Sequence, residues 1–276
     1  MITGAARIAG VVGDPVAQSR SPLLHNHWLA RHQIDGAYIP LPVAPADLAS
    51  AIAGLRRAGF AGVNLTIPHK QTGLALCTTL DHTAKRAGAV NTLVFGPGGI
   101  HGSNTDGAGF LANLAAHGHA AGRPALLLGA GGAARAIAAA LLDAGAAVSL
   151  ANRSPGRADA LRAAVPGVRL VHWEARAAAL ADHGLLVNTT ALGMAGQPPL
   201  DLDLSRAPAD MVVADIVYVP LKTALLTAAR TRQLATVPGL GMLLHQAVPG
   251  FAAWFGVTPV VDRELYEIVA AGNAPA

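Results

Sequence analysis

The sequence predicts an α/β protein of two domains: a mixed or parallel α/β domain first, and a doubly wound nucleotide-binding domain second. Short apolar runs alternate with helical patterns along the 276 residues, which indicates parallel strands joined by crossover helices. A glycine-rich turn at 129–134 lies between a four-residue apolar strand and a strongly apolar helix, as in dinucleotide-binding units. The length suffices for two domains of ordinary size.

Composition favours a soluble cytoplasmic protein. Hydrophobic residues make up 52% of the chain and charged residues 13%, so large cores are possible. The longest uncharged window, 233–261, contains three prolines and cannot give the ~20 consecutive apolar helical residues of a membrane span. The first residues lack the apolar core of a signal peptide, and Cys77 is the single cysteine, so no internal disulfide is expected.

Charge and histidine spacing limit the classes of ligand. The net charge is +4 without any block of five or six like charges, which argues against a nucleic-acid surface. A modest positive bias suits phosphate and carboxylate ligands. The histidines show no metal-binding spacing. We therefore expect a small-molecule substrate, no metal, no nucleic acid, no membrane, and a monomer or homodimer.

Strand and helix signals place the expected elements in order. The first domain, 1–105 completed by 239–276, is expected to hold strands over 8–12, 38–43 and 62–67, a helix from Pro22, helices over 47–58 and 68–80, a short helical segment over 84–88, and a hairpin of 91–95 with 100–102. The second domain, 106–238, is expected to begin with a helix through Leu114 and to hold strands over 125–128, 148–151, 185–188, 211–215 and 233–237, with helices over 135–144 and 155–164. Two helical patterns follow over 239–271, separated by 256–259.

The stretch 63–70 is the first candidate site. Its alternating pattern predicts a strand that turns Asn64 and Thr66 to one face. Pro68 would then start a helix and leave Lys70 near the helix N-terminus, where the macrodipole disfavours a cation. A lysine in such a place can exchange protons near neutral pH. The plain alternative is a strand end with a solvated lysine.

Two serines precede the first predicted helix. Ser19 and Ser21 are two residues apart, so in an extended segment their hydroxyls face the same way. Helix capping explains Ser21, which comes directly before Pro22, but leaves Ser19 unexplained.

The glycine-rich turn fits the pattern G-x-G-x-x-G/A of a Rossmann dinucleotide site. Gly129 permits the tight turn, Gly131 lets the backbone approach a pyrophosphate, and Ala134 lets helix and strand pack closely. The phosphates would lie against the turn and the helix start, which comprise Gly129, Ala130, Gly131, Gly132 and Ala133.

The end of the second strand of that domain favours NADP over NAD. The acidic residue that usually binds the ribose 2′-hydroxyl of NAD is missing, and Asn152, Arg153 and Ser154 stand there instead. Arg153, with Arg157 one turn on, suits a 2′-phosphate. The alternative is a surface arginine beside a serine that only caps the next helix.

Four other polar residues have both plain and functional interpretations. Asp106 would cap the helix through Leu114, and Asn91 would occupy a turn. Tyr218 follows a strand at the edge where ligands collect in parallel sheets. Gln246 lies in an apolar helix, where a glutamine either reaches solvent or binds a ligand.

Taken together, these segments resemble the shikimate dehydrogenase family along nearly the whole chain. The motifs are "GDPVAQSRSPLLHN" at 13–26, "VNLTIPHK" at 63–70, "GAVNT" at 88–92, "NTDG" at 104–107, "GAGGAARA" at 129–136, "NRS" at 152–154, "NTTALGM" at 188–194, "VYVPLKTALL" at 217–226 and "GLGMLLHQA" at 239–247. The resemblance implies an NADP-dependent oxidoreductase that interconverts 3-dehydroshikimate and shikimate in aromatic amino-acid biosynthesis.

The resemblance also implies roles for single residues. Lys70 and Asp106 would form the acid–base pair, and Ser19 and Ser21 would bind the substrate carboxylate. The ring hydroxyls would be held by Asn64, Thr66, Asn91, Asp106 and Gln246, and Tyr218 would complete the pocket. Thr189, Ile216, Gly239 and Met242 would line the cofactor. The C-terminal helices would return to the first domain, and domain closure would bring the nicotinamide to the substrate.

Departures from the family pattern leave the catalytic groups in place. Gln18, Ala191 and Ile216 replace more usual residues near the serine pair and the cofactor. The alternatives are a quinate/shikimate dehydrogenase that uses NAD, a folate-linked methylene dehydrogenase of similar architecture, and a non-catalytic NADP-binding regulator. The polar set argues against the folate enzyme, and Ser21, where quinate users tend to carry threonine, favours shikimate over quinate.

Overall fold

The computed structural model describes residues 2–272, which form two compact units. Unit 1 holds the chain up to Thr105 together with the chain from Leu244 onward, and unit 2 is Asp106–Leu243. Each unit contains one six-stranded sheet. No helix among residues 2–272 is both long and apolar enough to cross a membrane.

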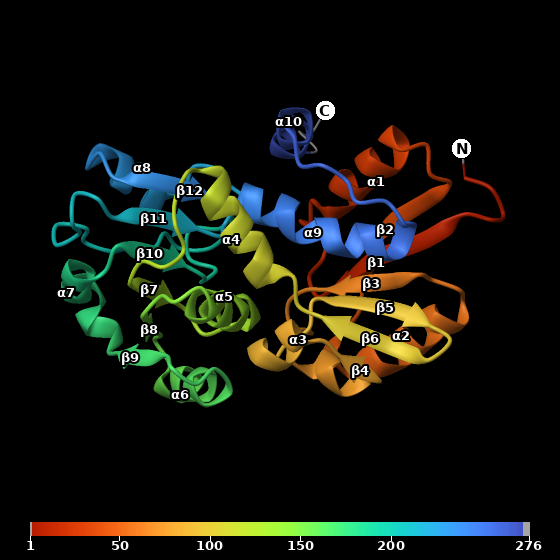
Figure 1. The fold of residues 1–276 in the computed structure, drawn as a ribbon, viewed down its shortest axis with the longest axis horizontal. Coiled ribbons are helices and arrows are strands. Elements are labelled where there is room, and N and C mark those ends of the chain that lie inside the picture. The colour runs from red at the N-terminus through yellow and green to blue at the C-terminus, as the bar shows by residue number, and fades with distance from the viewer. Residues whose placement is uncertain (1, 273–276) are drawn as a thin grey trace. The chain divides into compact units, whose positions relative to one another are not determined.

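Unit 1 is built on a mixed sheet with the strand order β2-β1-β3-β5-β6-β4 (Figure 1). Its strands are β1 (Arg7–Gly13), β2 (Gly36–Pro42), β3 (Gly62–Leu65), β4 (Thr79–Leu80), β5 (Thr92–Gly96) and β6 (Gly99–Ser103). Its helices are α1 (Ser21–Arg31), α2 (Leu48–Arg57), α3 (His82–Ala87) and α10 (Arg263–Ala271), with 3-10 helices at Pro45–Asp47 and Thr72–Leu76. Helix α9 (Leu240–Phe255) begins in unit 2 and continues into unit 1.

The two faces of this sheet are covered by different helices. On one face, α2 packs Ile52 against Val63 and Leu65 of β3. On the other face, aromatic residues of α1 and of the C-terminal part of α9 pack together, including Trp28 and Phe251. Figure 1 accordingly shows the blue helix α9 beside the red strands β1 and β2, although these segments lie far apart in sequence.

Small residues on the sheet make room for one of these aromatic rings. Parallel register aligns Ala9 of β1 with Tyr38 of β2 on one side and with Gly62 of β3 on the other, so all three side-chain positions share a face. A Cβ at Gly62 would lie 2.3 Å from Nε1 of Trp254. That indole N–H donates to the Leu93 carbonyl at 3.0 Å, which fixes α9 to the sheet.

Both edges of the unit 1 sheet offer little unpaired backbone. On β2, the Tyr38 N–H donates to Oδ1 of Asn26 at 2.9 Å, and the Tyr38 carbonyl accepts from Nδ2 of the same asparagine at 2.8 Å. Pro40 and Pro42 lack an N–H altogether. The opposite edge strand, β4, is two residues long.

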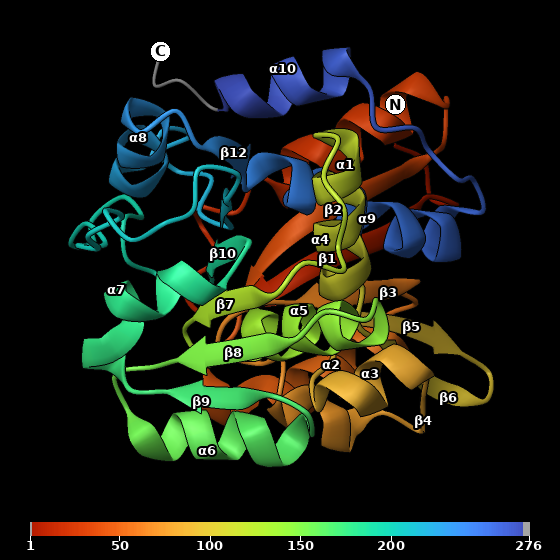
Figure 2. The same ribbon diagram turned by 60° about the vertical axis from the view of Figure 1, so that its left-hand side comes forward.

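Unit 2 is a doubly wound parallel sheet with the strand order β12-β11-β10-β7-β8-β9 (Figure 2). Its strands are β7 (Ala125–Leu128), β8 (Val148–Ala151), β9 (Arg169–Val171), β10 (Leu185–Asn188), β11 (Val212–Asp215) and β12 (Ala235–Pro238). Its helices are α4 (Asp106–Ala116), α5 (Gly132–Asp143), α6 (Pro155–Ala164), α7 (Arg176–Ala179) and α8 (Ala224–Thr231), with 3-10 helices at Trp173–Ala175 and Leu180–Asp182.

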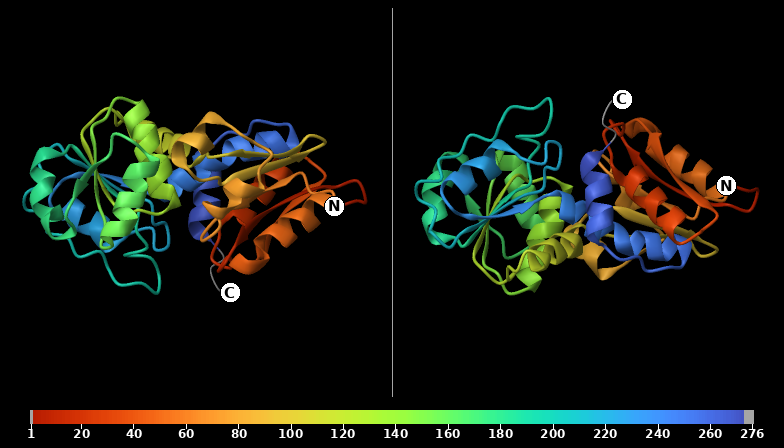
Figure 3. Two further views of the ribbon diagram at one scale, coloured as in Figure 1. Left: turned by 90° about the horizontal axis from the view of Figure 1, so that it is seen from below. Right: turned by 90° about the horizontal axis from the view of Figure 1, so that it is seen from above.

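Helices cover both faces of this second sheet (Figure 3). Leu127 and Val187 point to the face covered by α4, α5 and α6, whereas Leu126 and Leu186 point to the face covered by α8 and the Leu180–Asp182 turn. Strands buried on both faces appear as continuous apolar runs rather than alternating ones. This explains why β7 reads Ala-Leu-Leu-Leu.

Most predicted elements are confirmed, and one is wrong. Strands β7, β8 and β10 and helix α6 have the predicted bounds, and the hairpin of β5 and β6 forms as expected. The helix predicted over 68–80 does not form. The strand β3 ends at Leu65, the chain makes a turn through residues 67–71, and only the 3-10 helix Thr72–Leu76 follows.

Candidate active site

The serine pair at the start of α1 is arranged differently from a simple cap. The Ser19 hydroxyl accepts from the Ser21 backbone N–H at 3.3 Å. The N-cap residue of α1 is Arg20, and no side chain caps this helix. Ser21 is buried, and its hydroxyl lies beside the phenol of Tyr38, where it opposes the rise in the pKa of that phenol caused by burial. Helix capping therefore does not explain Ser21. It is the Ser19 hydroxyl that bonds the local backbone, at the N–H of Ser21.

Asn64 joins this group through Tyr38. The Tyr38 hydroxyl donates to Oδ1 of Asn64 at 2.6 Å. Nδ2 of Asn64 donates to the Asn91 carbonyl at 3.0 Å and to Oγ1 of Thr92 at 3.1 Å. Tyr38 and Asn64 both lie on the face of the sheet that α1 and α9 cover. Ala9 of β1 pairs with Tyr38 and Val11 of β1 pairs with Asn64, and residues two apart on a strand share a face.

The network continues to Gln246 on α9. Nδ2 of Asn91 donates to Oγ1 of Thr105 at 2.9 Å and to Oε1 of Gln246 at 3.3 Å. Oδ1 of Asn91 accepts from the Thr105 N–H at 2.9 Å and from the Thr92 hydroxyl at 2.9 Å. The structure thus brings together Ser21, Asn64, Asn91 and Gln246 from four separate segments of unit 1. Asn91 is a buried junction, not the turn residue of the plain interpretation.

Tyr38, Thr92 and Thr105 belong to this group but were not predicted from the sequence. Tyr38 lies on β2 outside every motif, whereas Thr92 is the last residue of the motif at 88–92 and the first residue of β5. Their positions become meaningful only when the register of the sheet is known. Thr105 stands inside the quoted motif at 104–107, and its proximity to the predicted Asp106 was the available signal.

Lys70 and Thr66 follow the end of β3. The Thr66 N–H donates to the Val12 carbonyl at 2.9 Å, and the Lys70 carbonyl accepts from the Val90 N–H at 2.8 Å, so the turn that carries both residues is fixed at each end. Because no α-helix begins at Pro68, the expectation that Lys70 stands at a helix N-terminus is wrong. A role for Lys70 as a proton donor or acceptor therefore rests on its neighbours and not on a helix dipole.

Asp106 and Tyr218 belong to unit 2. Helix α4 begins at Asp106, which is buried and is the first helical residue. Tyr218 follows β11 by three residues, at the carboxyl edge of the parallel sheet. Both residues make interactions in the structure.

The turn after β7 has the backbone that a pyrophosphate requires. Gly129 has a φ of +105°, and a Cβ there would lie 2.9 Å from both Oγ1 of Thr189 and Cγ2 of Thr190. Gly131 is the N-cap of α5, and a Cβ there would meet nothing within 4 Å. Gly129 therefore serves the fold, while the open space at Gly131 leaves room for a phosphate at the helix N-terminus. Ala134 is fully buried against the sheet.

The residues after β8 suit a ribose 2′-phosphate. Arg153, Ser154 and Arg157 are exposed, and Nδ2 of Asn152 donates to the Ser154 carbonyl at 2.9 Å. Ser154 is the N-cap of α6, but its side chain makes no capping hydrogen bond. Ser154 is therefore the N-cap residue without a side-chain cap, and both interpretations of the exposed Arg153 stay open.

The loops after β10 and β11, at the carboxyl edge of the unit 2 sheet, are tied together by a buried carboxylate that the sequence analysis missed. Asp215 accepts from Nδ2 of Asn188 at 2.9 Å, from the Val217 N–H at 3.0 Å and from the Thr223 hydroxyl at 2.8 Å. Burial raises the pKa of Asp215, against these hydrogen bonds. Oδ1 of Asn188 in turn accepts from the N–H of Thr190 at 3.0 Å. A carboxylate at the end of an apolar strand was the signal available.

The predicted nicotinamide-side residues lie at the same edge. The Thr189 hydroxyl donates to the Leu128 carbonyl at 2.7 Å, joining the loops after β10 and β7. A Cβ at Gly239 would lie 2.4 Å from the backbone of Ile216, so the start of α9 approaches the loop after β11 very closely. Met242 is buried in the core cluster beside them. These loops flank β7 and β10, where the strand order reverses and doubly wound sheets bind ligands.

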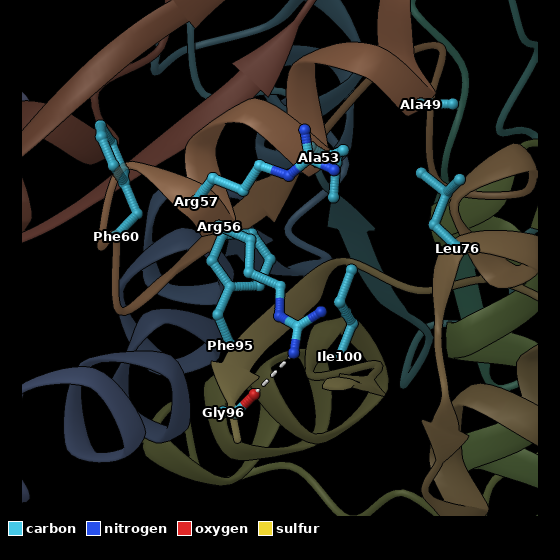
Figure 4. Close-up of a pocket in the computed structure, with 10 residues that line it drawn as sticks. Ala49, Ala53, Arg56, Arg57, Phe60, Leu76, Phe95, Gly96 and Ile100 are labelled. Atoms are coloured by element: carbon cyan, nitrogen blue, oxygen red, sulfur yellow. Dashed lines mark hydrogen bonds between the residues drawn. The ribbon is translucent and has the colours of Figure 1, made fainter. Parts of the chain in front are cut away.

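A cavity of about 610 Å³ lies elsewhere in unit 1 (Figure 4). Its wall is formed by α2 and the β5–β6 hairpin, and includes Phe60, Phe95 and Arg56, whose guanidinium donates to the Gly96 carbonyl at 3.1 Å. None of the predicted substrate or cofactor residues lines it. The histidines form no cluster with other metal-ligating side chains within the described residues, and His25 and His69 are core residues.

Comparison with known proteins gives the family. Residues 11–93 match the family model described as the shikimate dehydrogenase substrate binding domain. The chain is 66% identical to a shikimate dehydrogenase (NADP(+)) of Acidiphilium cryptum over 272 residues, 98% of each chain. This chain belongs to the shikimate dehydrogenase family.

Solved structures show the range of ligands on this fold. Shikimate 5-dehydrogenase from Thermus thermophilus, in complex with NADP(H) and shikimate, has a TM-score of 0.86 and 38% identity, covering 96% of this chain and 98% of that one. Quinate dehydrogenase from Corynebacterium glutamicum, in complex with NAD, has a TM-score of 0.88 and 30% identity, covering 95% and 98%. Because the fold is the same in both, only local residues can decide the substrate and the cofactor.

Proposed function

We propose that this protein catalyses the reversible reduction of 3-dehydroshikimate to shikimate with NADPH, in the cytoplasm, as a step of aromatic amino-acid biosynthesis. The observation that carries the proposal is the polar network of unit 1, which runs from Tyr38 through Asn64 and Asn91 to Gln246, with Ser21 beside Tyr38. A small ring with one carboxylate and several hydroxyls needs such a row of neutral donors and acceptors. Membership of the family supplies the substrate class.

We propose that unit 1 supplies most of the substrate-binding residues and that unit 2 binds the cofactor. Ser19 and Ser21 would bind the carboxylate, because hydroxyl donors suit an anion without requiring a buried cation. Asn64, Thr66, Asn91, Asp106 and Gln246 would hold the ring hydroxyls, and Tyr218 would complete the pocket. NADPH, when bound, supplies the hydride.

Proton transfer would be the task of Lys70 and Asp106. Reduction of a carbonyl leaves an alkoxide unless a proton reaches that oxygen, and a lysine ammonium can donate it. Asp106 would orient the ammonium and accept a hydrogen bond from a neighbouring hydroxyl. In the oxidative direction, the amine of Lys70 would take this proton up from the substrate hydroxyl as the hydride leaves for NADP.

The residues of unit 2 support NADP as the cofactor. The open space at Gly131 and the N-terminus of α5 suit the pyrophosphate, with Ala130, Gly132 and Ala133 beside it. Asn152, Arg153 and Ser154 would bind the 2′-phosphate, where an NAD site normally has an acid. Thr189, Ile216, Gly239 and Met242 would form the wall beside the nicotinamide.

The decisive experiment measures initial rates with purified protein for shikimate and quinate, each with NADP and with NAD. We expect the rate to be dominated by shikimate with NADP. Comparable quinate activity with NAD would favour the alternative of a quinate/shikimate dehydrogenase. No rate with any pair would favour the non-catalytic regulator on this scaffold.

Two variants test the proposed roles. Lys70→Ala should lower kcat by about 10²–10⁴, while Lys85→Ala, at an exposed lysine of α3, should not. Arg153→Ala should reduce the preference for NADP over NAD, while Arg169→Ala, at an exposed arginine of β9, should leave it unchanged. Full turnover in Lys70→Ala would refute the acid–base assignment.

A further inference from the structure

We propose that Tyr38 is a positioning residue of the substrate site, which fixes the side-chain amide of Asn64 so that it offers substrate only an acceptor. This inference rests on the proposed function and names a residue and a hydrogen-bond polarity that the proposed function leaves open. Tyr38 itself lies within the sheet and is 1% exposed. It acts on the substrate through Asn64.

The ring of Tyr38 is held in one orientation by its neighbours. It stacks on the imidazole of His25 with a centroid distance of 4.0 Å and an angle of 12°. Trp254 lies against it with a centroid distance of 5.9 Å. Ala9 and Gly62, the small residues beside it on the sheet, leave the space that the indole fills. The position of the phenol oxygen is therefore set by the core of unit 1.

The hydrogen bonds of this oxygen have a fixed direction. A phenol has one proton, and the distance of 2.6 Å to Oδ1 of Asn64 assigns the proton to that bond, because an amide oxygen can only accept. Tyr38 thereby fixes which side of the Asn64 amide carries the oxygen.

Rotating the side-chain amide of Asn64 by half a turn, so that its oxygen and nitrogen exchange places, would break its hydrogen bonds. Its Nδ2 faces the Asn91 carbonyl at 3.0 Å and Oγ1 of Thr92 at 3.1 Å. A flipped amide would place its oxygen against that carbonyl and its NH₂ against the phenol proton of Tyr38. Both hydrogens of Nδ2 are therefore used within the protein, and the remaining hydrogen-bonding capacity of Asn64 is a lone pair on Oδ1.

This polarity restricts what Asn64 can hold. A lone pair accepts from a hydroxyl and repels a carbonyl oxygen. The reacting oxygen is a hydroxyl in shikimate and a carbonyl in 3-dehydroshikimate, so an acceptor cannot bind it in both states. Asn64 must instead bind a hydroxyl that the reaction does not change.

Tyr38→Phe tests the inference, because it removes one hydroxyl and keeps the ring. We expect the KM for shikimate and the KM for 3-dehydroshikimate to rise by a similar factor of about ten, as one lost hydrogen-bond contribution implies. The KM for NADP should stay unchanged, and kcat should change less than the KM values do.

A stability-matched control separates positioning from a general loosening of unit 1. Ile52→Val acts on the opposite face of the sheet, under α2, where it lowers the melting temperature without touching the network. If Tyr38→Phe lowers the melting temperature like Ile52→Val and leaves both substrate KM values unchanged, the inference is overturned. A rise in one substrate KM alone would overturn the assignment of an unchanged hydroxyl.

A second position covers the case in which Tyr38→Phe fails to fold. Thr92→Val removes the acceptor that holds Nδ2 of Asn64, and should produce the same rise in both KM values, while Thr92→Ser keeps the hydroxyl and should restore them. Failure of the proposed function would look different. Wild-type protein that neither oxidises nor binds shikimate would overturn both, whereas active wild type with unchanged KM values in these variants would overturn the inference alone.

Discussion

Acid should destabilise unit 1 through one histidine, His25. Its side chain is fully buried, and neither ring nitrogen has a hydrogen-bond partner within the described residues. Around it lie the rings of Tyr38, Trp28, Phe251 and Trp254. Burial in this apolar surrounding lowers the pKa of His25 to about 3.

The magnitude follows from the difference between the folded and unfolded states. Below the ordinary histidine pKa of about 6.5, the unfolded chain takes up a proton that the folded chain refuses. The stability contributed by the neutral ring is therefore complete above pH 6.5 and is lost as the pH falls towards 3. Each pH unit within this window corresponds to about 1.4 kcal/mol, so the loss between pH 7 and pH 5 is about 2 kcal/mol.

The assay compares urea unfolding of wild type and His25→Phe at pH 7 and pH 5. Tryptophan fluorescence is a suitable signal, because Trp28 and Trp254 both contact His25. Wild type should lose about 2 kcal/mol more than the variant between the two pH values. Phenylalanine also changes packing, but that effect is common to both pH values and cancels in the difference.

An exposed histidine supplies the control. His172→Gln should keep the pH dependence of the wild type, because that side chain is exposed. Equal losses of unfolding free energy in His25→Phe and in the wild type between pH 7 and pH 5 would refute this role of His25. Such a result would mean that His25 takes up a proton in the folded state, through a conformation that reaches solvent.

Three further substitutions give measurable changes. Gly239→Ala places a methyl group 2.4 Å from the backbone of Ile216, so calorimetry should show a loss of about 1–3 kcal/mol and the KM for NADP should rise. Asp215→Ala removes an acceptor from three buried donors, of which only Nδ2 of Asn188 keeps another, the Leu192 carbonyl, and should cost about 3 kcal/mol or more in urea unfolding; a loss under ~1 kcal/mol would show that water replaces the carboxylate. Asp262→Asn keeps the cap of α10 and loses only the exposed ion pair with Arg31, so the free energy of unfolding should fall by about 0.2–1 kcal/mol. Asp262→Ala also loses the cap and should cost about 1 kcal/mol more. Equal shifts in the melting temperature of the two variants would show that the cap contributes nothing.

Local patterns predicted unit 2 better than unit 1. Its strands are buried on both faces and short, so β7 and β8 stand out as apolar runs between breakers, and their bounds could be predicted to the residue. The glycine-rich turn over 129–134 could be predicted because Gly129 and Gly131 act through their own backbone. The motif is therefore contained in neighbouring residues.

The substrate side depends on contacts across the sheet. Tyr38 and Asn64 are 26 residues apart and meet only because β1 separates their strands in a particular register. No local pattern contains that register. The helix predicted after Pro68 failed for a related reason: proline suits a first helical turn, but the following segment bonds to its neighbours as a turn instead. The sequence analysis identified Asn64 and Gln246 as candidate site residues. It did not identify Tyr38, which hydrogen-bonds Asn64.

The edge strand β2 has a consequence for how copies of this protein can associate. Aggregation through continued sheets needs a row of unpaired backbone donors and acceptors. On β2, Asn26 occupies the donor and the acceptor of Tyr38, and two prolines remove further donors. The sheet of unit 1 therefore cannot be extended by a neighbouring strand along this side. Contacts between copies of unit 1 at this edge must be made by side chains, and high protein concentration should not lead to fibrous assembly from it.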